Sequence, residues 1–150
     1  MFNGRSTEYD DIFIENNGFW AGINIEEFQK QRAIPLQIPL EMCKAALIAA
    51  MQGVNLDLKD VENRYRREGI QSVGQIQGSV VNGENYVQTL YKKSVFARAK
   101  AELLPEFNTL SAREIHENRQ YVAEQKSLLA EASFAIRTLK GKKRSMVKLI

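Results

Sequence analysis

The apolar residues between Leu40 and Tyr65 recur at intervals of three and four, and this spacing constrains the fold more than any other feature. Because an α-helix turns once every 3.6 residues, they form one apolar face of a helix of about 28 residues, roughly 40 Å long. Pro39 suits the first position of this helix, and Gly69 suits its C-terminal end. The residues of the face are Leu40, Cys43, Leu47, Ala50, Val54, Leu58, Val61 and Tyr65.

A second long helix is predicted over residues 84–104, and it is apolar on two sides. A helix of this kind lies in the middle of a bundle or packs against another subunit. Pro105 is expected to end or kink it. One face carries Leu90, Ala97, Ala101 and Leu104, and the other Phe96, Ala99, Leu103 and Phe107.

A third long helix is predicted from about residue 111 to Lys140. Ser111 and Glu114 have the spacing of a capping box, and Gly141 stops the helix. Arg137 and Lys140 suit the negative end of the helix dipole. Its apolar positions are Ile115, Val122, Leu129 and Ile136, every seven residues, with Tyr121, Leu128, Ala132 and Leu139 beside them.

A short helix is predicted over residues 25–33, capped by Asn24 and ended by Pro35. Asn17-Gly18, in the first 24 residues, is a hairpin-type turn signal, so this segment is either an arm or a hairpin. Phe19 and Trp20 anchor it on the protein's own core or on a neighbouring subunit.

The predicted fold class is therefore all-α: a small bundle of about four helices, one short and three long. Residues 1–24 form an extended N-terminal arm, residues 25–140 the bundle, and residues 141–150 an extended basic C-terminal tail. The connection over residues 69–84, GIQSVGQIQGSVVNGE, is long for a compact domain, which is typical of functional or disordered loops. We expect it to be mobile in the free protein and more ordered in an assembly.

The charges are distributed unevenly along the chain. The last 14 residues carry six basic side chains and no acidic one, which leaves 15 basic and 18 acidic residues before them. The protein is thus a mildly acidic body with a basic tail, which argues against a general DNA-coating role.

No motif for chemistry is recognisable. His116 is the single histidine, beside Glu114 and Glu117, and no histidine or cysteine cluster offers a metal site. Cys43 is expected to be a buried, inert thiol in a reducing cytoplasm. No nucleophile elbow, Walker motif or dinucleotide fingerprint occurs. We expect no enzyme activity, no cofactor and no metal.

No segment indicates a membrane protein. The longest apolar run, Ala45 to Met51, is too short to span a bilayer, and the first residues lack the pattern of a signal peptide.

Four segments together resemble the head completion (head stabilisation) proteins of tailed bacteriophages, the GPL family. They are NNGFWAGINIEEFQKQRAIP, AALIAAMQGVNLDL, LYKKSVFARAKAELL and FAIRTLKGKKRSMVKLI, and the resemblance covers roughly residues 12–150. Two departures are Ala21-Gly22, where a proline and an acid are expected after the tryptophan, and Pro105, where the helix would continue.

The resemblance implies a structural virion protein, assembled in the host cytoplasm and located at the portal and neck region of the virion. Such proteins join the portal vertex after DNA packaging as a head–tail connector (adaptor) ring, commonly a dodecamer. The ring retains the DNA and offers a platform to the next neck or tail completion protein. The alternative is a DNA-binding packaging accessory similar to a small terminase subunit, against which stand the acidic body and the lack of a basic recognition helix.

The C-terminal tail is the predicted binding site. An alternating strand with no partner in a helical chain suits addition to another protein's sheet, here the portal. The basic run before it has three open interpretations: a solvated segment, a contact with acidic groups of the portal, or a non-specific contact with packaged DNA. The predicted portal-docking residues are Met146, Val147, Lys148, Leu149 and Ile150, and those for an anionic partner or DNA are Lys140, Lys142, Lys143 and Arg144.

Overall fold

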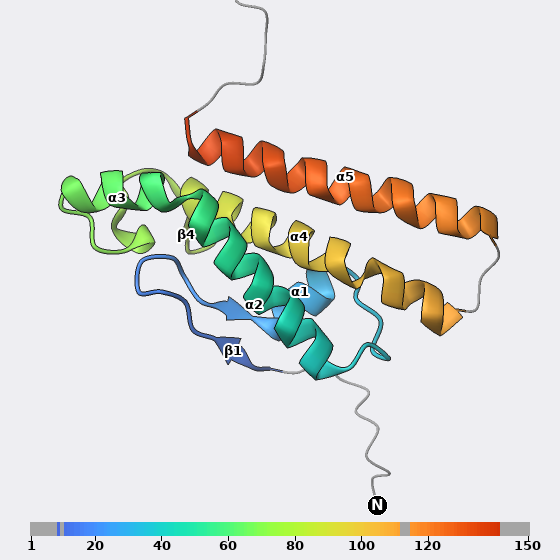
Figure 1. Ribbon diagram of the computed structural model, residues 1–150. Helices are drawn as coiled ribbons and strands as arrows, with labels where there is room; N and C mark the ends of the chain where they lie inside the picture. The colour runs from blue at the N-terminus through green and yellow to red at the C-terminus, as the bar shows by residue number, and fades with distance from the viewer. Residues whose placement is uncertain (1–8, 10, 112–114, 142–150) are drawn as a thin grey trace, which may run out of the picture.

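The structure, a computed structural model, is a mostly helical bundle (Figure 1). It describes residue 9 and residues 11–111 and 115–141, and of these the side chains of residues 108–119 are left undescribed. The helices are α1 (Ile25–Gln31), α2 (Leu40–Asp57), α3 (Lys59–Arg67), α4 (Tyr86–Ser111) and α5 (Ile115–Leu139), with a 3₁₀ turn η1 (Val73–Gln75). Two short antiparallel pairs join β1 (Phe13–Ile14) to β2 (Ile23–Asn24), and β3 (Val80–Val81) to β4 (Glu84–Asn85).

The helical fold class is confirmed, but the described residues hold five α-helices rather than four, and two small sheets. The predicted long helix is divided at Leu58, whose backbone leaves the helical region at φ −99° and ψ 13°. Asn55 and Asp57 just before it are weak helix formers, because their side chains compete for backbone hydrogen bonds. Bonds from Leu58 N–H to Val54 O and from Glu62 N–H to Leu58 O, both 2.9 Å, bridge the junction.

The apolar face predicted along this segment is continuous across the junction. Leu40 and Tyr65, at its two ends, pack partly buried against the core. Pro39 is the N-cap, one residue earlier than predicted. The six residues between the ends are all buried: Cys43, Leu47, Ala50, Val54, Leu58 and Val61.

Helix α4 lies between α2 on one side and α5 on the other (Figure 1). Its two apolar faces therefore enter two different clusters. Phe96, Ala99 and Leu103 join the main core, while Ala97, Ala101 and Leu104 pack against Leu128 and Ala132 of α5. Two residues depart from this division: Leu90, predicted on the face of Ala97, joins the main core, and Phe107 packs against both clusters. Of the two alternatives for this helix, the central position within the bundle is correct.

Pro105 does not end α4, contrary to one form of the prediction. The helix continues through it to Ser111. Ser111, predicted to cap the next helix in a capping box with Glu114, is instead the last residue of α4, and Glu114 lies outside the described residues. Gly141, with φ 76°, follows the last turn of α5, and its N–H donates to Thr138 O at 2.9 Å, as expected of a helix stop.

The seven-residue stripe predicted on α5 is only partly buried. Ile136 is buried, whereas Val122 and Leu129 are 52% and 46% exposed. A strict seven-residue repeat drifts by about 20° per heptad around a straight helix, so the stripe leaves the contact face toward the start of α5. The positions predicted beside the stripe, Leu128, Ala132 and Leu139, are buried, and Ala135 joins them.

The segment after residue 11 is a hairpin rather than an extended arm. Phe13 pairs with Asn24 and Ile14 with Ile23. Phe19 and Trp20, in the turn between the strands, are 1% and 2% exposed and belong to the main core. They anchor the hairpin on the protein's own core, not on a neighbouring subunit.

Candidate interaction surfaces

The turn that contains Asn17 is held by the amide side chains of Asn16 and Asn17, and Asn16 Nδ2 donates to the carbonyl of Ala21 at 2.9 Å. Asn17 Oδ1 accepts hydrogen bonds from the backbone N–H groups of Phe19 (3.1 Å) and Trp20 (3.0 Å). Its Nδ2 donates to the buried carboxylate of Glu62 at 3.0 Å, which also pairs with Arg66 at 2.9 Å. The NNGFW segment, which carries part of the family resemblance, is thus a structural turn whose Phe19 and Trp20 are buried.

A second amide network lies beside this turn. Asn16 Nδ2 donates to the hydroxyl of Tyr91 (2.8 Å), and Tyr91 donates to Asn55 Oδ1 (2.6 Å). The ring of Trp20 stacks on that of Tyr91, with centroids 4.7 Å apart. Burial raises the pKa of the Tyr91 hydroxyl far above its ordinary value, so this group stays protonated at neutral pH. The network holds the hairpin against α2 and α4.

Ion pairs connect α1 to the two C-terminal helices. Lys92 of α4 contacts the carboxylates of Glu27 (2.6 Å) and Glu84. Burial acts to lower the pKa of Lys92, but the bonds to these two carboxylates outweigh it and the pKa is raised. Arg32 donates two hydrogen bonds to the carboxylate of Glu131 on α5, at 3.1 and 2.5 Å. These bonds lower the pKa of Glu131.

Most of the predicted site lies outside the described residues. That is true of Lys142, Lys143, Arg144 and the segment Met146–Ile150. Lys140 is half-buried at the end of α5, where its N–H donates to Ile136 O at 3.0 Å. The structure therefore places the start of the tail and leaves its binding role as a prediction.

The tail starts beside the β3–β4 hairpin. Gln125 of α5 bonds to Ala101 of α4, and further along α4 the ring of Phe107 meets that of Tyr121, which precedes Gln125, so α4 and α5 run antiparallel in a fixed register. This register sets Leu139 level with the first turn of α4, which follows β4 directly (Figure 1).

The β3–β4 hairpin is exposed and apolar. Val80, Val81 and Tyr86 are 62%, 74% and 66% exposed. Residues 69–83 contain no charged side chain, although 26% of the chain is charged. Loss of charge, not of all polarity, is what distinguishes the centre of a protein–protein interface from other surface. The stretch 69–83, together with the exposed valines of β3, is therefore a candidate contact surface, and the one charged residue of the hairpin, Glu84, is paired with Lys92.

The loop over residues 69–84, which was predicted to be mobile, contains a 3₁₀ turn and a hairpin. Val73 is buried, and the buried Asn85 donates from Nδ2 to its carbonyl at 2.9 Å. Asn82 and Gly83 both have positive φ, 49° and 82°, as a two-residue type I′ turn requires. The Asn-Gly pair in the sequence is the signal that could have revealed this second hairpin.

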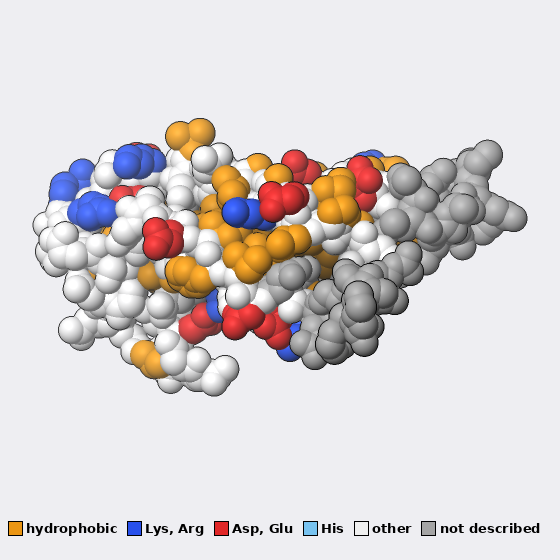
Figure 2. Space-filling model, turned by 90° about the horizontal axis from the view of Figure 1, so that it is seen from below, with side chains coloured by type: hydrophobic (Ala, Val, Ile, Leu, Met, Phe, Trp, Pro, Cys, Tyr) orange, Lys and Arg blue, Asp and Glu red, His pale blue; other side chains and the backbone are white. Residues whose placement is uncertain are grey.

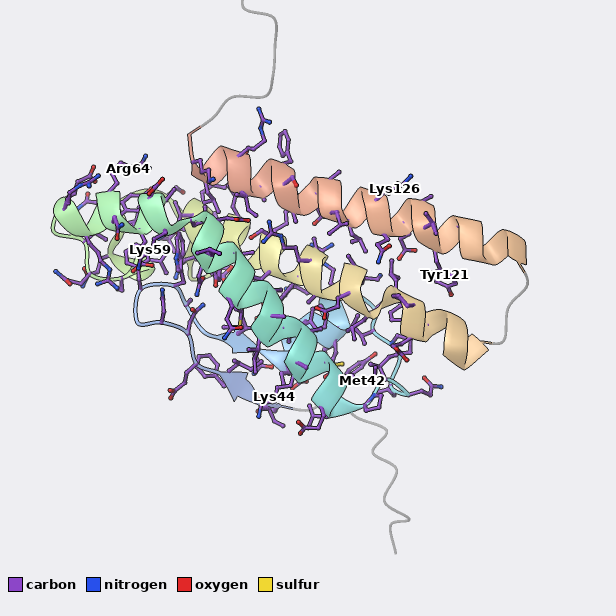
Figure 3. The ribbon with its side chains drawn as sticks, in the orientation of Figure 1. Met42, Lys44, Lys59, Arg64, Tyr121 and Lys126 are labelled. Carbon is purple, nitrogen blue, oxygen red and sulfur yellow. The ribbon has the colours of Figure 1, made fainter. Side chains whose placement is uncertain are left out.

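Helix α3 adds a basic cluster that sequence reasoning missed. Lys59, Arg64 and Arg67 are exposed, and Lys and Arg side chains gather at this end of the molecule (Figures 2 and 3). The signal was the run Arg64-Tyr65-Arg66-Arg67, but Asp60, Glu62 and Glu68 offset most of its charge.

The described residues hold no group of three or more His, Cys, Asp or Glu side chains that could bind a metal ion. None of the described helices is long and apolar enough to cross a bilayer.

The sequence matches known phage proteins over its whole length. The sequence model of the phage head completion protein (GPL) family matches residues 14–150. A protein of Haemophilus phage HP1 (strain HP1c1), described as a probable head completion/stabilization protein, is 70% identical over 150 residues, which cover all of both chains. No solved structure matches.

Proposed function

The chain belongs to the phage head completion protein (GPL) family, and on that premise we propose that it completes the DNA-filled head by binding the portal vertex as a connector ring. Members of this family are structural proteins of the phage head, not enzymes. In this role the ring retains the packaged DNA and presents a platform to the neck or tail completion protein. A ring of subunits multiplies the affinity of each weak contact.

The observation that carries the proposal is the extent of the family match, which continues through the C-terminal tail to residue 150. Among the described residues, Leu139 is the last buried side chain of α5 and Gly141 follows the helix, which supports a tail that lies outside the bundle. A tail that the bundle does not need is available for a partner. We assign Met146, Val147, Lys148, Leu149 and Ile150 to docking on the portal.

For the basic residues Lys140, Lys142, Lys143 and Arg144 we propose a contact with acidic groups of the portal. The exposed Arg137 and the basic cluster on α3 lie at the same end of the bundle. This end of the subunit would then face a negatively charged partner.

The test is binding of the full chain and of a chain truncated after Arg144 to purified portal and to filled heads. The full chain should bind and the filled heads should retain their DNA. The truncated chain should remain folded, fail to bind, and leave heads that leak DNA or do not accept tails. Normal docking by the truncated chain would move the portal contact to the helices.

The DNA-binding alternative is favoured only by the exposed Lys59, Arg64 and Arg67 of α3. A gel shift with long duplex DNA in moderate salt, run beside the portal experiment, separates the two functions. A DNA-binding accessory protein would shift the duplex without portal, with an affinity that falls steeply as salt is added.

A further inference from the structure

We propose that the free edge of the β3–β4 hairpin binds the chain's own C-terminal segment, residues 146–150, before the protein meets the portal. This inference rests on the docking role proposed for the tail. It assigns the tail a resting site on the same subunit.

The hairpin offers a free edge at a defined residue. Val81 pairs with Glu84 across the two-residue turn, and Val80 pairs with Asn85. Residues that flank such a turn form the hydrogen-bonded pair, so at the next residue the N–H and C=O point outward. Val80 therefore presents one backbone donor and one acceptor to an added strand.

The hairpin is held firmly enough to act as a template. Asn85 donates to the carbonyl of Val73, and its own N–H is bonded by Gln88 Oε1 at 2.8 Å. Glu84 is fixed by Lys92. The strand edge is thus preformed, which reduces the entropy lost on binding.

The side chains at this edge match the tail. Val80 and Val81 are exposed, and the carboxylate of Glu84, opposite Val81, is paired with Lys92. Val147 and Leu149 alternate along the tail with Lys148 between them. Because successive side chains of a strand point to opposite faces, Val147 and Leu149 would cover one of the two valines, and Met146 and Ile150 would lie on the side of the other. No basic side chain in residues 69–83 repels the tail's cations.

The length of the tail also fits. Gly141 lies level with the start of α4, and packed helices are separated by about 8–10 Å. One further strand spacing of about 4.8 Å separates β4 from β3. The linking residues 142–145 let Met146 lie up to about 16 Å from Gly141, at about 3.3 Å per residue. An extended linker is therefore about as long as these two spacings together.

The short linker favours the chain's own tail over that of another copy. A short flexible linker gives an effective concentration of about 1 mM, far above the concentration of free protein in a dilute sample. At such a concentration the tail binds weakly to the hairpin of its own chain, whereas it does not bind the hairpin of another chain. When the tail leaves this edge and binds the portal, Val80 and Val81 become exposed. They would therefore be exposed in the assembled ring and covered in the free protein.

The test is disulfide trapping in the full chain with Cys43→Ser, so that no other thiol is present. Val81→Cys with Leu149→Cys should oxidise to an intrachain disulfide at low protein concentration. The matched control is Leu36→Cys with Leu149→Cys, because Leu36 is also exposed but precedes α2, at the opposite end of the bundle. Equal trapping in both pairs, or disulfides mainly between chains, would overturn the proposal.

Hydrogen exchange gives a second readout that needs no portal. The Val80 amide should exchange several-fold faster in the chain truncated after Arg144 than in the full chain, while the amides of α4 are unchanged. If Val80 exchange does not respond but truncation abolishes portal binding, this inference fails and the proposed function stands. If Val80 exchange responds but the truncated chain docks normally, the resting contact stands and the tail's portal role fails.

Discussion

The side-chain amide of Gln125 on α5 donates a 2.9 Å hydrogen bond to the backbone carbonyl of Ala101 on α4. This carbonyl is the one that residue 105 would bond in an ordinary helix, but Pro105 has no N–H. A side chain from the neighbouring helix thus takes the place of the missing backbone donor. This explains how α4 continues through a proline and remains packed against α5.

Gln125→Leu should therefore destabilise the protein by about 1–3 kcal/mol, the cost of leaving a buried carbonyl without a donor. For a chain of this length each kcal/mol lowers the melting temperature by roughly 2–4 °C. Urea unfolding of the single variants and of Gln125→Leu with Pro105→Ala measures the coupling. Pro105→Ala restores the backbone N–H, so the double variant should recover most of the loss. If the double variant loses as much stability as the two single variants together, Gln125 does not replace the missing N–H of Pro105.

Gly22→Ala should destabilise the N-terminal hairpin by about 1–3 kcal/mol through overpacking. A Cβ at Gly22 would lie 2.2 Å from Phe13 Cζ and 2.6 Å from the carbonyl oxygen of Ile14. Adding Phe13→Ala should recover little, because the Ile14 carbonyl belongs to the backbone and cannot move aside.

Gly53→Ala is the matched control for this variant and should have the opposite sign. The added Cβ would meet only the flexible end of Arg98, at 3.3 Å. Alanine favours the helix over glycine by about 1 kcal/mol. Thermal melts of both variants test the pair, and equal losses would mean that steric contact is not the cause at Gly22.

Glu131→Gln should cost about 1 kcal/mol at neutral pH, since the pair with Arg32 is only partly shielded from water. The pKa of Glu131 is lower in the folded protein than in the unfolded chain. Its contribution is therefore complete above the unfolded pKa of about 4.3 and is lost as the pH falls through the folded value. Unfolding free energies of the two proteins should converge in this acidic window. Glu26→Gln, which breaks an exposed pair with Lys30, should change stability far less.

Asn85→Ala should loosen the segment between α3 and α4 more than the core. It removes the donor to the Val73 carbonyl and the acceptor for the Gln88 N–H, 2.9 Å each. Hydrogen exchange should rise in residues 73–76 and remain slow in α2 and in the middle of α4. A uniform rise across the protein would show that Asn85 supports the whole fold instead of this segment.

The sequence predicted best what depends on local periodicity and on buried apolar residues. The face from Cys43 to Val61 and the central position of α4 follow from three-and-four spacing, which a helix converts directly into one side. The break at Leu58 was missed, because Asn55 and Asp57 lower helix propensity only slightly and their effect depends on tertiary partners. The continuation of α4 past Pro105 was also missed, because the compensating donor, Gln125, comes from another helix. The tail remains a prediction from alternation and charge, since most of it lies outside the described residues.

Val147→Asp with Leu149→Asp should abolish docking on the portal while the melting temperature changes by only a few degrees. Both residues follow Gly141, beyond the last buried side chain of α5, so their substitution removes little core. The two positions share one strand face, and a buried, unpaired carboxylate there is costly for any partner.

Neutralising Lys142, Lys143 and Arg144 together should instead weaken docking only partly. Added salt should weaken docking of the unmodified chain to the same degree, because exposed charges are screened within about 8 Å at physiological ionic strength. Portal pull-downs over a salt series measure both effects. If the aspartate variant unfolds, the tail belongs to this domain's own core, and if it docks normally, the contact lies on the helices.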